Sequence, residues 1–201
     1  LHNYAKGDWK AISQYNDNLV NNNLRLGRTW DAAQHIYWHG LLKIYQGYFN
    51  EAQWMVDRLR NIAQEYDNKF ALMLMYELNI NMLLESRNLR EALLESEKAI
   101  ILAQETIFNI YLFDLYSYKT LIHILMQEMS VAEISLQEMR KIRPTTSAVP
   151  IELISFYRTE MEFWLCRFQE SIEQGDTSMS ADFRKAFKAS WRRMARVSEK
   201  A

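Results

Sequence analysis

Two histidines, His35 and His39, lie four residues apart, so their imidazole rings are expected on one face of a helix. That spacing suits a shared metal ion. The residues between them lack the glutamate of a metalloprotease motif, and no cysteine or carboxylate repeats on that face. We therefore interpret the pair as partly buried histidines in a helix contact and predict no metal site. The isolated residues His2 and His123 receive the same interpretation.

The one cysteine, Cys166, lies in an apolar stretch that begins at Phe163. A nucleophilic thiol needs a base and a lowered pKa. The sequence supplies neither, so we predict that Cys166 is a small buried residue. Most carboxylates alternate with basic residues, as Glu95 and Lys98 do, which is typical of solvated helix faces. The chain has no glycine-rich phosphate loop and no Ser/His/Asp arrangement in a recognisable context. We therefore predict no catalytic residue and no cofactor, and we expect the protein not to be an enzyme.

The composition predicts an all-α fold. Of 201 residues, 49% are apolar, whereas only 5 are glycine and 2 are proline. Folds rich in strands need more turn residues, and the abundant Leu, Ala, Glu, Gln, Met, Arg and Lys favour helices. The scarcity of glycine and proline therefore indicates long helices joined by short turns.

Charge and hydropathy exclude several classes of partner. The net charge of −1 provides no overall field for nucleic acid, and no apolar run approaches the ~20 residues of a membrane span. A single cysteine permits no internal disulfide and favours a reducing, cytoplasmic location. The chain opens on Leu1 in a helix-like stretch, so we expect a fragment of a longer polypeptide, with a processed terminus as the alternative.

A short pattern recurs at intervals of 40 residues, over 7–12, 47–52, 87–92 and, more weakly, 127–132. A large apolar residue that can staple the next helix recurs as Trp9, Phe49, Leu89 and Met129. A compact residue, where helices must approach closely, recurs as Ile12, Ala52, Ala92 and Ala132. Seven residues later on the same face lie Leu19, Leu59, Ala99 and Met139. Gly7 and Gly47 suit a turn of positive φ, whereas Arg87 and Gln127 lack that freedom, so we expect their turns to differ.

The periodic apolar positions define the expected helices. First helices are expected at 29–46, 69–86, 107–127 and 150–174, and second helices at 8–24, 49–66, 89–105, 130–142 and 180–199, after a stub at 1–5. The corresponding hairpins cover roughly 1–24, 29–66, 69–105, 107–142 and 150–199 within a single domain, 1–201. Pro144 and Pro150 mark the clearest break, and Gly175 a second one. We expect Trp9, Trp38, Trp54 and Trp164 to fill the core between helices.

One repeat resembles the tetratricopeptide (TPR) signature, through Gly40, Gly47, Phe49, Ala52 and Leu59. The other repeats depart from it, since Ile80 and Thr120 replace the first glycine and no repeat ends in the usual proline. The resemblance implies an α-solenoid of antiparallel helix hairpins with a right-handed twist. The period of 40 exceeds the usual 34 and resembles that of long TPR-like arrays next to ATPase modules in bacterial signalling proteins.

In TPR proteins the first helices line a concave surface that contacts ligands, so the resemblance implies a set of partner-binding residues. The positions of this sequence that match those residues are Gln34, Tyr37, Leu41, Glu77, Asn81, Asp114 and Ser117, with Tyr45 as a further candidate. The alternatives are a solvated concave face without a partner, or contacts to another part of the same polypeptide.

The last expected helix is the one charge anomaly. Residues 182–201 carry a net +5 and an apolar stripe of Phe183, Phe187, Trp191 and Met194. A basic amphipathic helix can bind a membrane surface, an acidic partner or nucleic acid. We favour a capping helix that packs this stripe on the preceding hairpin. At the other end of the array, we expect an exposed surface that permits a homodimer.

The sequence therefore leaves two functions open. The first is a non-catalytic protein-interaction or regulatory scaffold of a multidomain signalling protein, which binds a peptide, a partner protein or another domain of the same polypeptide. The alternative is a small-molecule or peptide sensor that controls oligomerisation through an enclosed apolar pocket.

Overall fold

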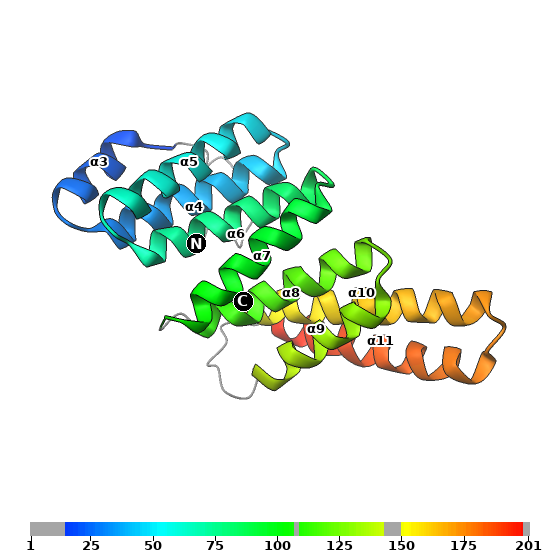
Figure 1. The fold of residues 1–201 in the computed structure, drawn as a ribbon. Coiled ribbons are helices and arrows are strands. Elements are labelled where there is room, and N and C mark those ends of the chain that lie inside the picture. Colours follow the sequence, from blue (N-terminus) through cyan, green and yellow to red (C-terminus); the bar gives the residue numbers. More distant parts are fainter. Residues whose placement is uncertain (1–14, 107–108, 143–149, 199–201) are drawn as a thin grey trace. The chain divides into compact units, whose positions relative to one another are not determined.

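A computed structural model describes residues 15–106, 109–142 and 150–198, and this part of the chain is all-helical (Figure 1). The helices are α3 (Asp17–Arg25), α4 (Thr29–Tyr45), α5 (Phe49–Glu65), α6 (Lys69–Glu85), α7 (Leu89–Gln104), α8 (Asn109–Leu125), α9 (Met129–Ile142), α10 (Pro150–Glu173) and α11 (Thr177–Ser198). None of these helices has the length and apolar character needed to cross a membrane. The prediction of an all-α chain is confirmed for the described residues.

Helix boundaries from α4 to α11 agree with the expected ranges to within three residues. The first expected second helix, 8–24, is not continuous, because residues 15 and 16 are not helical and α3 begins at Asp17. Its expected part at 8–14 lies outside the described residues. Asn16 is extended and caps that helix, since its side-chain oxygen accepts a hydrogen bond from the Leu19 amide at 3.2 Å. The stub at 1–5 and the repeat copy at 7–12, with Trp9, lie outside the described residues.

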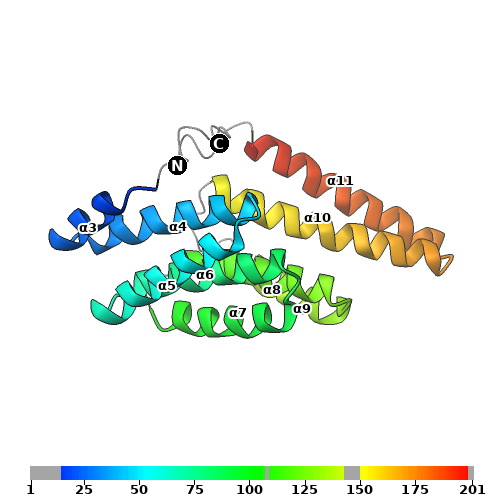
Figure 2. The same cartoon turned by 90° about the horizontal axis from the view of Figure 1, so that it is seen from above.

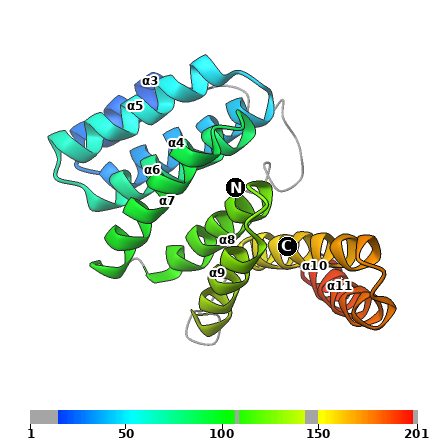
Figure 3. The same cartoon turned by 45° about the vertical axis from the view of Figure 1, so that its right-hand side comes forward.

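The chain divides into two compact units, Leu1–Leu102 and Ala103–Ala201. In the first unit, α4 packs against α3, α5 and α6, and α5 also packs against α6 (Figure 2). In the second unit, α8 packs against α9 and α10, while α10 and α11 lie side by side as a hairpin (Figure 3). The expectation of one continuous domain over 1–201 stays a prediction.

The turns that end α3, α4, α6, α8 and α10 share one hydrogen-bond pattern. At the end of α4, the Gly47 amide donates to the Ile44 carbonyl at 2.9 Å and the Tyr48 amide to the Lys43 carbonyl at 2.9 Å. These are the two bonds of a Schellman motif, which requires one residue of positive φ. That residue is glycine at 27, 47 and 175, with φ between 70° and 78°.

Arg87 and Gln127 occupy the same turn position with φ of 61° and 63°. Their amides donate to Leu84 and Ile124, as the Gly47 amide does to Ile44. The expectation that these two turns would differ was therefore wrong. Helix packing holds both residues in a backbone conformation that an L-residue adopts only at a cost.

The small-residue column of the repeat is buried as expected, because Ala52, Ala92 and Ala132 are all fully inaccessible. The column seven residues later is buried at Leu59, Ala99 and Met139. Leu19 departs from it and is 45% exposed on the short helix α3. Trp54 was also expected in the core, but its side chain is 42% exposed because it lies on the outer face of α5.

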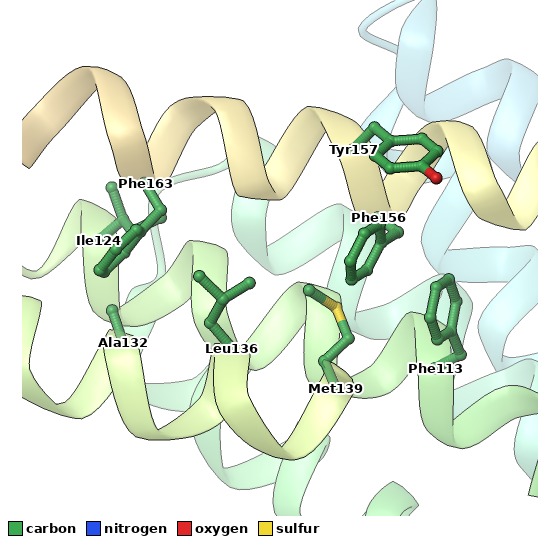
Figure 4. Packing of buried hydrophobic residues seen from close by; sticks show 8 residues of the cluster. All are labelled: Phe113, Ile124, Ala132, Leu136, Met139, Phe156, Tyr157 and Phe163. Carbon is green, nitrogen blue, oxygen red and sulfur yellow. The ribbon is translucent and has the colours of Figure 1, made fainter. Parts of the chain in front are cut away.

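The core of the second unit joins three helices (Figure 4). Phe113 of α8 stacks on Phe156 of α10 with ring centroids 5.1 Å apart, and Tyr157 meets Phe156 edge-on at 5.0 Å. The remaining buried members of this cluster are Ile124, Ala132, Leu136, Met139 and Phe163. Met194 and Val197 of α11 pack against it from the end of the chain, so all four helices of the unit share one interior.

Candidate functional site

Most of the residues carried over from the TPR resemblance are packed inside the protein. Tyr37, Leu41, Glu77, Asn81 and Ser117 are buried. Gln34 and Asp114 are half-buried, and the further candidate Tyr45 is 53% exposed. Partner binding by this set stays a prediction.

Two of these buried polar residues use their hydrogen-bonding groups internally. The Ser117 hydroxyl donates to the Phe113 carbonyl at 2.9 Å, and its oxygen lies 2.8 Å from the sulfur of Met139. The Asn81 amide donates to the Glu77 carbonyl one turn earlier at 2.8 Å. Both groups therefore satisfy the demand that a buried polar group be paired, without a ligand.

The histidine pair forms an aromatic cluster with Tyr15 and Trp54. The rings of His35 and His39 have centroids 4.5 Å apart on α4. Tyr15 stacks on His35 at 5.6 Å and meets His39 edge-on at 5.5 Å. The ring of Trp54 on α5 packs edge-on against Tyr15 at 5.4 Å. The interpretation of the two histidines as part of a helix contact thus agrees with this packing.

This cluster disfavours positive charge on the imidazoles. Burial, with the neighbouring charges of His35 and Lys43 adding to it, lowers the pKa of His39 to about 4. Burial also lowers the pKa of His35. His35 Nε2 and His39 Nδ1 are buried without a hydrogen-bond partner. Among the described residues, no group of three or more potential ligands gathers around a common point, so the pair would give a metal only two protein ligands.

Tyr15 is held in place by polar contacts as well as by ring packing. Its hydroxyl donates to Asp17 at 3.3 Å, and Arg58 of α5 donates to the same carboxylate oxygen at 3.2 Å. The Arg58 guanidinium also lies 5.4 Å from the centre of the Trp54 ring. Burial raises the pKa of Tyr15 to about 12, so its hydroxyl stays a hydrogen-bond donor at neutral pH. These contacts fasten the start of α3 onto α4 and α5.

Cys166 is half-buried and packs against the α8–α9–α10 cluster. Burial raises the pKa of its thiol, and the carboxylates of Glu162 and Glu170 add to that effect. A raised pKa keeps the thiol protonated, whereas a nucleophile needs the thiolate. The environment thus agrees with the expected packing role.

Sequence reasoning missed a buried ion pair in the second unit. Glu160 of α10 is only 4% exposed and accepts two hydrogen bonds from Arg140 of α9, at 3.1 Å from Nε and 2.7 Å from Nη2. Its other oxygen accepts one from the Ser190 hydroxyl of α11 at 2.5 Å. Three helices are therefore joined through one carboxylate. The spacing of Glu160 from Phe156 and Phe163, four and three residues on one helical face, was the available signal.

A groove follows the seam between α10 and α11. Two cavities, of about 380 Å³ and 190 Å³, share Phe168 and Arg184 as lining residues. The apolar side chains along this α10–α11 groove include Leu165, Phe168 and Ile172 of α10 and Phe187 of α11, and the basic ones are Arg184 and Lys188. Leu165 is 37% exposed and Ile172 is 56% exposed. Large apolar side chains are thus exposed to solvent next to exposed basic side chains.

The apolar stripe of α11 divides between interior and surface. Phe183 stacks on Trp164 of α10 at 5.9 Å, and Met194 packs against the α8–α9–α10 cluster. Phe187 lines the α10–α11 groove, and Trp191, one turn further, is 52% exposed. The capping interpretation therefore accounts for Phe183 and Met194 but leaves Trp191 exposed.

Comparison with protein-family models, with curated proteins and with solved structures found no match to this chain.

Proposed function

We propose that this chain is a non-catalytic protein-interaction segment, built as a TPR-like array with a 40-residue repeat. The spacing of its helices supports this architecture, because α4 to α9 begin at residues 29, 49, 69, 89, 109 and 129. Two such helices with their turns occupy one period. Each hairpin of this kind buries its apolar face only by stacking on a neighbour.

Contacts between residues about one period apart support the same architecture within the first unit. The Asn68 side chain, which caps α6, donates to the Thr29 hydroxyl at the start of α4 at 2.7 Å. Arg58 of α5 reaches Asp17 of α3 across 41 positions. Positions about one period apart in successive hairpins are thus joined by hydrogen bonds, as expected for stacking of like units.

The observation that carries the interaction function is the α10–α11 groove. Exposed apolar side chains in contiguous groups mark sites where proteins bind one another. Leu165 and Ile172 expose apolar surface in one groove, whereas the candidate residues of the first-helix face are largely buried. We therefore assign partner binding to the α10–α11 hairpin.

The sensor alternative has less support. A cavity of about 400 Å³ lies between α3 and α5, lined among others by Asn21, Arg25, Arg58, Asn61, Glu65 and Tyr66. A small-molecule pocket is typically mostly apolar, with a few polar groups that fix the ligand. This cavity has only Leu24 and Ile62 as aliphatic lining residues and carries three charged ones, so it does not have that character.

Site-directed photo-crosslinking tests the proposal. A benzophenone amino acid replaces Ile172 in the α10–α11 groove, and in a control it replaces Ile134 of α9, which is 60% exposed. We expect an adduct with another protein from position 172 and none of that mass from position 134, in cells that make the whole protein. Binding of the purified partner to the purified chain then confirms it. Identical adducts at both positions, or none at 172, contradict the proposal.

A further inference from the structure

The α10–α11 groove lies on the side of its hairpin that the core leaves free. On α10, Phe156 and Phe163 face the α8–α9–α10 cluster. Leu165 and Ile172 are two and nine residues beyond Phe163, which places both about half a turn away from it. The hairpin therefore packs on its own unit with one side and exposes an apolar seam with the other.

Two antiparallel helices with an apolar seam between them offer the packing surface of a third helix. Side chains of such a helix, spaced three and four residues apart, fit between the ridges of the pair. Phe168 and Phe187 line the seam from the two sides, and Leu165 and Ile172 extend it by one turn in each direction along α10. The shape and chemistry of the groove thus fit an amphipathic helix.

The basic side chains at the groove favour a negatively charged ligand. Arg184 and Lys188 line it, Arg192 follows Lys188 by one helical turn, and all three are exposed. Among the described residues, none of the three forms an ion pair. Helix α11 carries six basic side chains and one acidic one, Asp182. A ligand helix with carboxylates beside its apolar stripe could form ion pairs with these three basic side chains.

We propose that the α10–α11 groove binds an acidic amphipathic helix of a partner protein, an inference that rests on the interaction function proposed above. The charge of the whole chain favours a peptide over a polyanion. Since α11 contributes a net +5 to a total of −1, the rest of the chain carries −6. That charge repels an extended phosphate backbone or an anionic membrane, whereas a single helix contacts only the basic seam.

Fluorescence anisotropy with labelled synthetic peptides tests the assignment on the full chain. The probe is a helix of about 18 residues, or five turns, with leucines in a stripe at spacings of three and four and glutamates on both flanks. One control peptide replaces the glutamates with lysine, and a second replaces the leucines with serine. We expect the acidic amphipathic peptide to bind at least ~10-fold more tightly than either control, with an affinity that falls as salt rises.

Paired variants of the protein locate the binding. Lys188→Glu reverses a charge at the groove, and Ile172→Ser removes exposed apolar surface from it. Each should weaken binding of the acidic peptide ~10-fold or more, about 1.4 kcal/mol. Arg193→Glu makes the same charge change five residues further, about 140° around α11, and Ile134→Ser makes the same apolar change on α9. These controls should change affinity less than ~2-fold, within the spread of surface substitutions.

Several results would overturn the assignment. One is equal affinity for all three peptides, and another is equal loss with the groove and control variants. Binding of phosphatidylserine vesicles or of a single-stranded oligonucleotide, lost in Lys188→Glu while the acidic peptide does not bind, would assign the groove to a polyanion instead. Self-association lost in Ile172→Ser, again without peptide binding, would assign it to a second copy. A protein adduct at position 172 without acidic-peptide binding refutes only this ligand class, whereas the absence of both refutes the proposed function as well.

Discussion

Arg140 of α9 donates two hydrogen bonds to a single oxygen of Glu160 on α10, and this carboxylate is almost completely buried. The Arg140 side chain is 39% exposed and lies 5.5 Å from the centre of the Trp164 ring. A buried carboxylate without its cationic partner is strongly destabilising, because no ion pair offsets the free energy of its desolvation. The pair therefore makes the packing of α9 against α10 depend on one arginine.

Arg140→Met should destabilise the protein by about 3 kcal/mol, because it leaves the charge of Glu160 with only the Ser190 hydroxyl. The double variant Arg140→Met/Glu160→Met should recover most of that loss, since it removes both charges. Urea denaturation gives the free energies, and hydrogen exchange of α9 and α10 localises the effect. A double variant as unstable as the single one would mean that apolar packing, not the unpaired charge, is responsible.

Burial of His35 and His39 predicts a loss of stability in acid. The folded state lowers the pKa of His39 to about 4, so the unfolded state binds more protons below the ordinary histidine pKa of about 6.5. Stability contributed by the neutral ring is complete above that pH and falls as pH drops toward 4. The expected loss from His39 is on the order of 2 kcal/mol, and His35 adds to it in the same direction.

His39→Gln should flatten the pH dependence of the unfolding free energy between pH 6.5 and 4, because glutamine does not titrate in this window. Urea denaturation at half-unit pH steps measures the slope. Lys43→Met serves as a second variant, since removal of its charge should raise the folded-state pKa of His39 toward the unfolded value. The loss of stability in acid should then be smaller and should level off at a higher pH. An unchanged slope in His39→Gln would show that other groups cause the acid sensitivity.

Helix positions in this chain follow from local sequence signals. Apolar residues at spacings of three and four defined α4 to α11 to within three residues. The structure adds that Asn68 caps the start of α6. The predicted start of α3 differs from the structure because the repeat copy at 7–12 suggested a helix from residue 8. The cap at Asn16 stops the helix that begins at Asp17 from extending backward.

Burial of polar and aromatic residues did not follow from the sequence, because it depends on which helix faces which. Glu160 shares a helical face with Phe156 and Phe163, but its pairing with Arg140 and Ser190, which permits burial, joins it to other helices. Trp54 has the apolar character of a core residue, yet Tyr15 and Arg58 cover only part of its ring. These contacts join segments remote in sequence, which periodicity along one helix does not report.

The Schellman turns predict substitutions of opposite sign at equivalent positions. Gln127 has φ of 63° and Gly47 has φ of 78°. Gln127→Gly relieves a left-handed strain of about 1–2 kcal/mol and loses about 0.4–1 kcal/mol to the more flexible unfolded chain. The net result should be a stabilisation of about 0.5 kcal/mol.

Gly47→Ala introduces that strain, although no other atom lies within 4 Å of an added Cβ, so it should destabilise by about 1 kcal/mol. Thermal and urea unfolding of both variants measure the difference. Since the space around Gly47 is open, a steric clash cannot explain the expected loss. Stabilisation by Gly47→Ala, or destabilisation by Gln127→Gly, would show that these turns do not hold their left-handed conformation in solution.

Gly40 of α4 packs directly against the side chain of Leu78 of α6. A Cβ added at Gly40 would lie 2.9 Å from Leu78 Cδ1 and even closer to Cδ2, and Leu78 is fully buried. Alanine gains about 1 kcal/mol over glycine within a helix, whereas overpacking a core costs about 1–3 kcal/mol. Gly40→Ala should therefore destabilise the protein by about 1 kcal/mol.

Leu78→Ala removes the obstructing atoms and should itself cost about 2–5 kcal/mol. In that background Gly40→Ala meets open space, so only its gain in helix propensity remains, and it should stabilise by about 1 kcal/mol. Urea denaturation of the wild type, both single variants and the double variant completes the cycle. The change of sign is the decisive feature, because equal effects of Gly40→Ala in both backgrounds would mean that α4 and α6 do not approach at this pair.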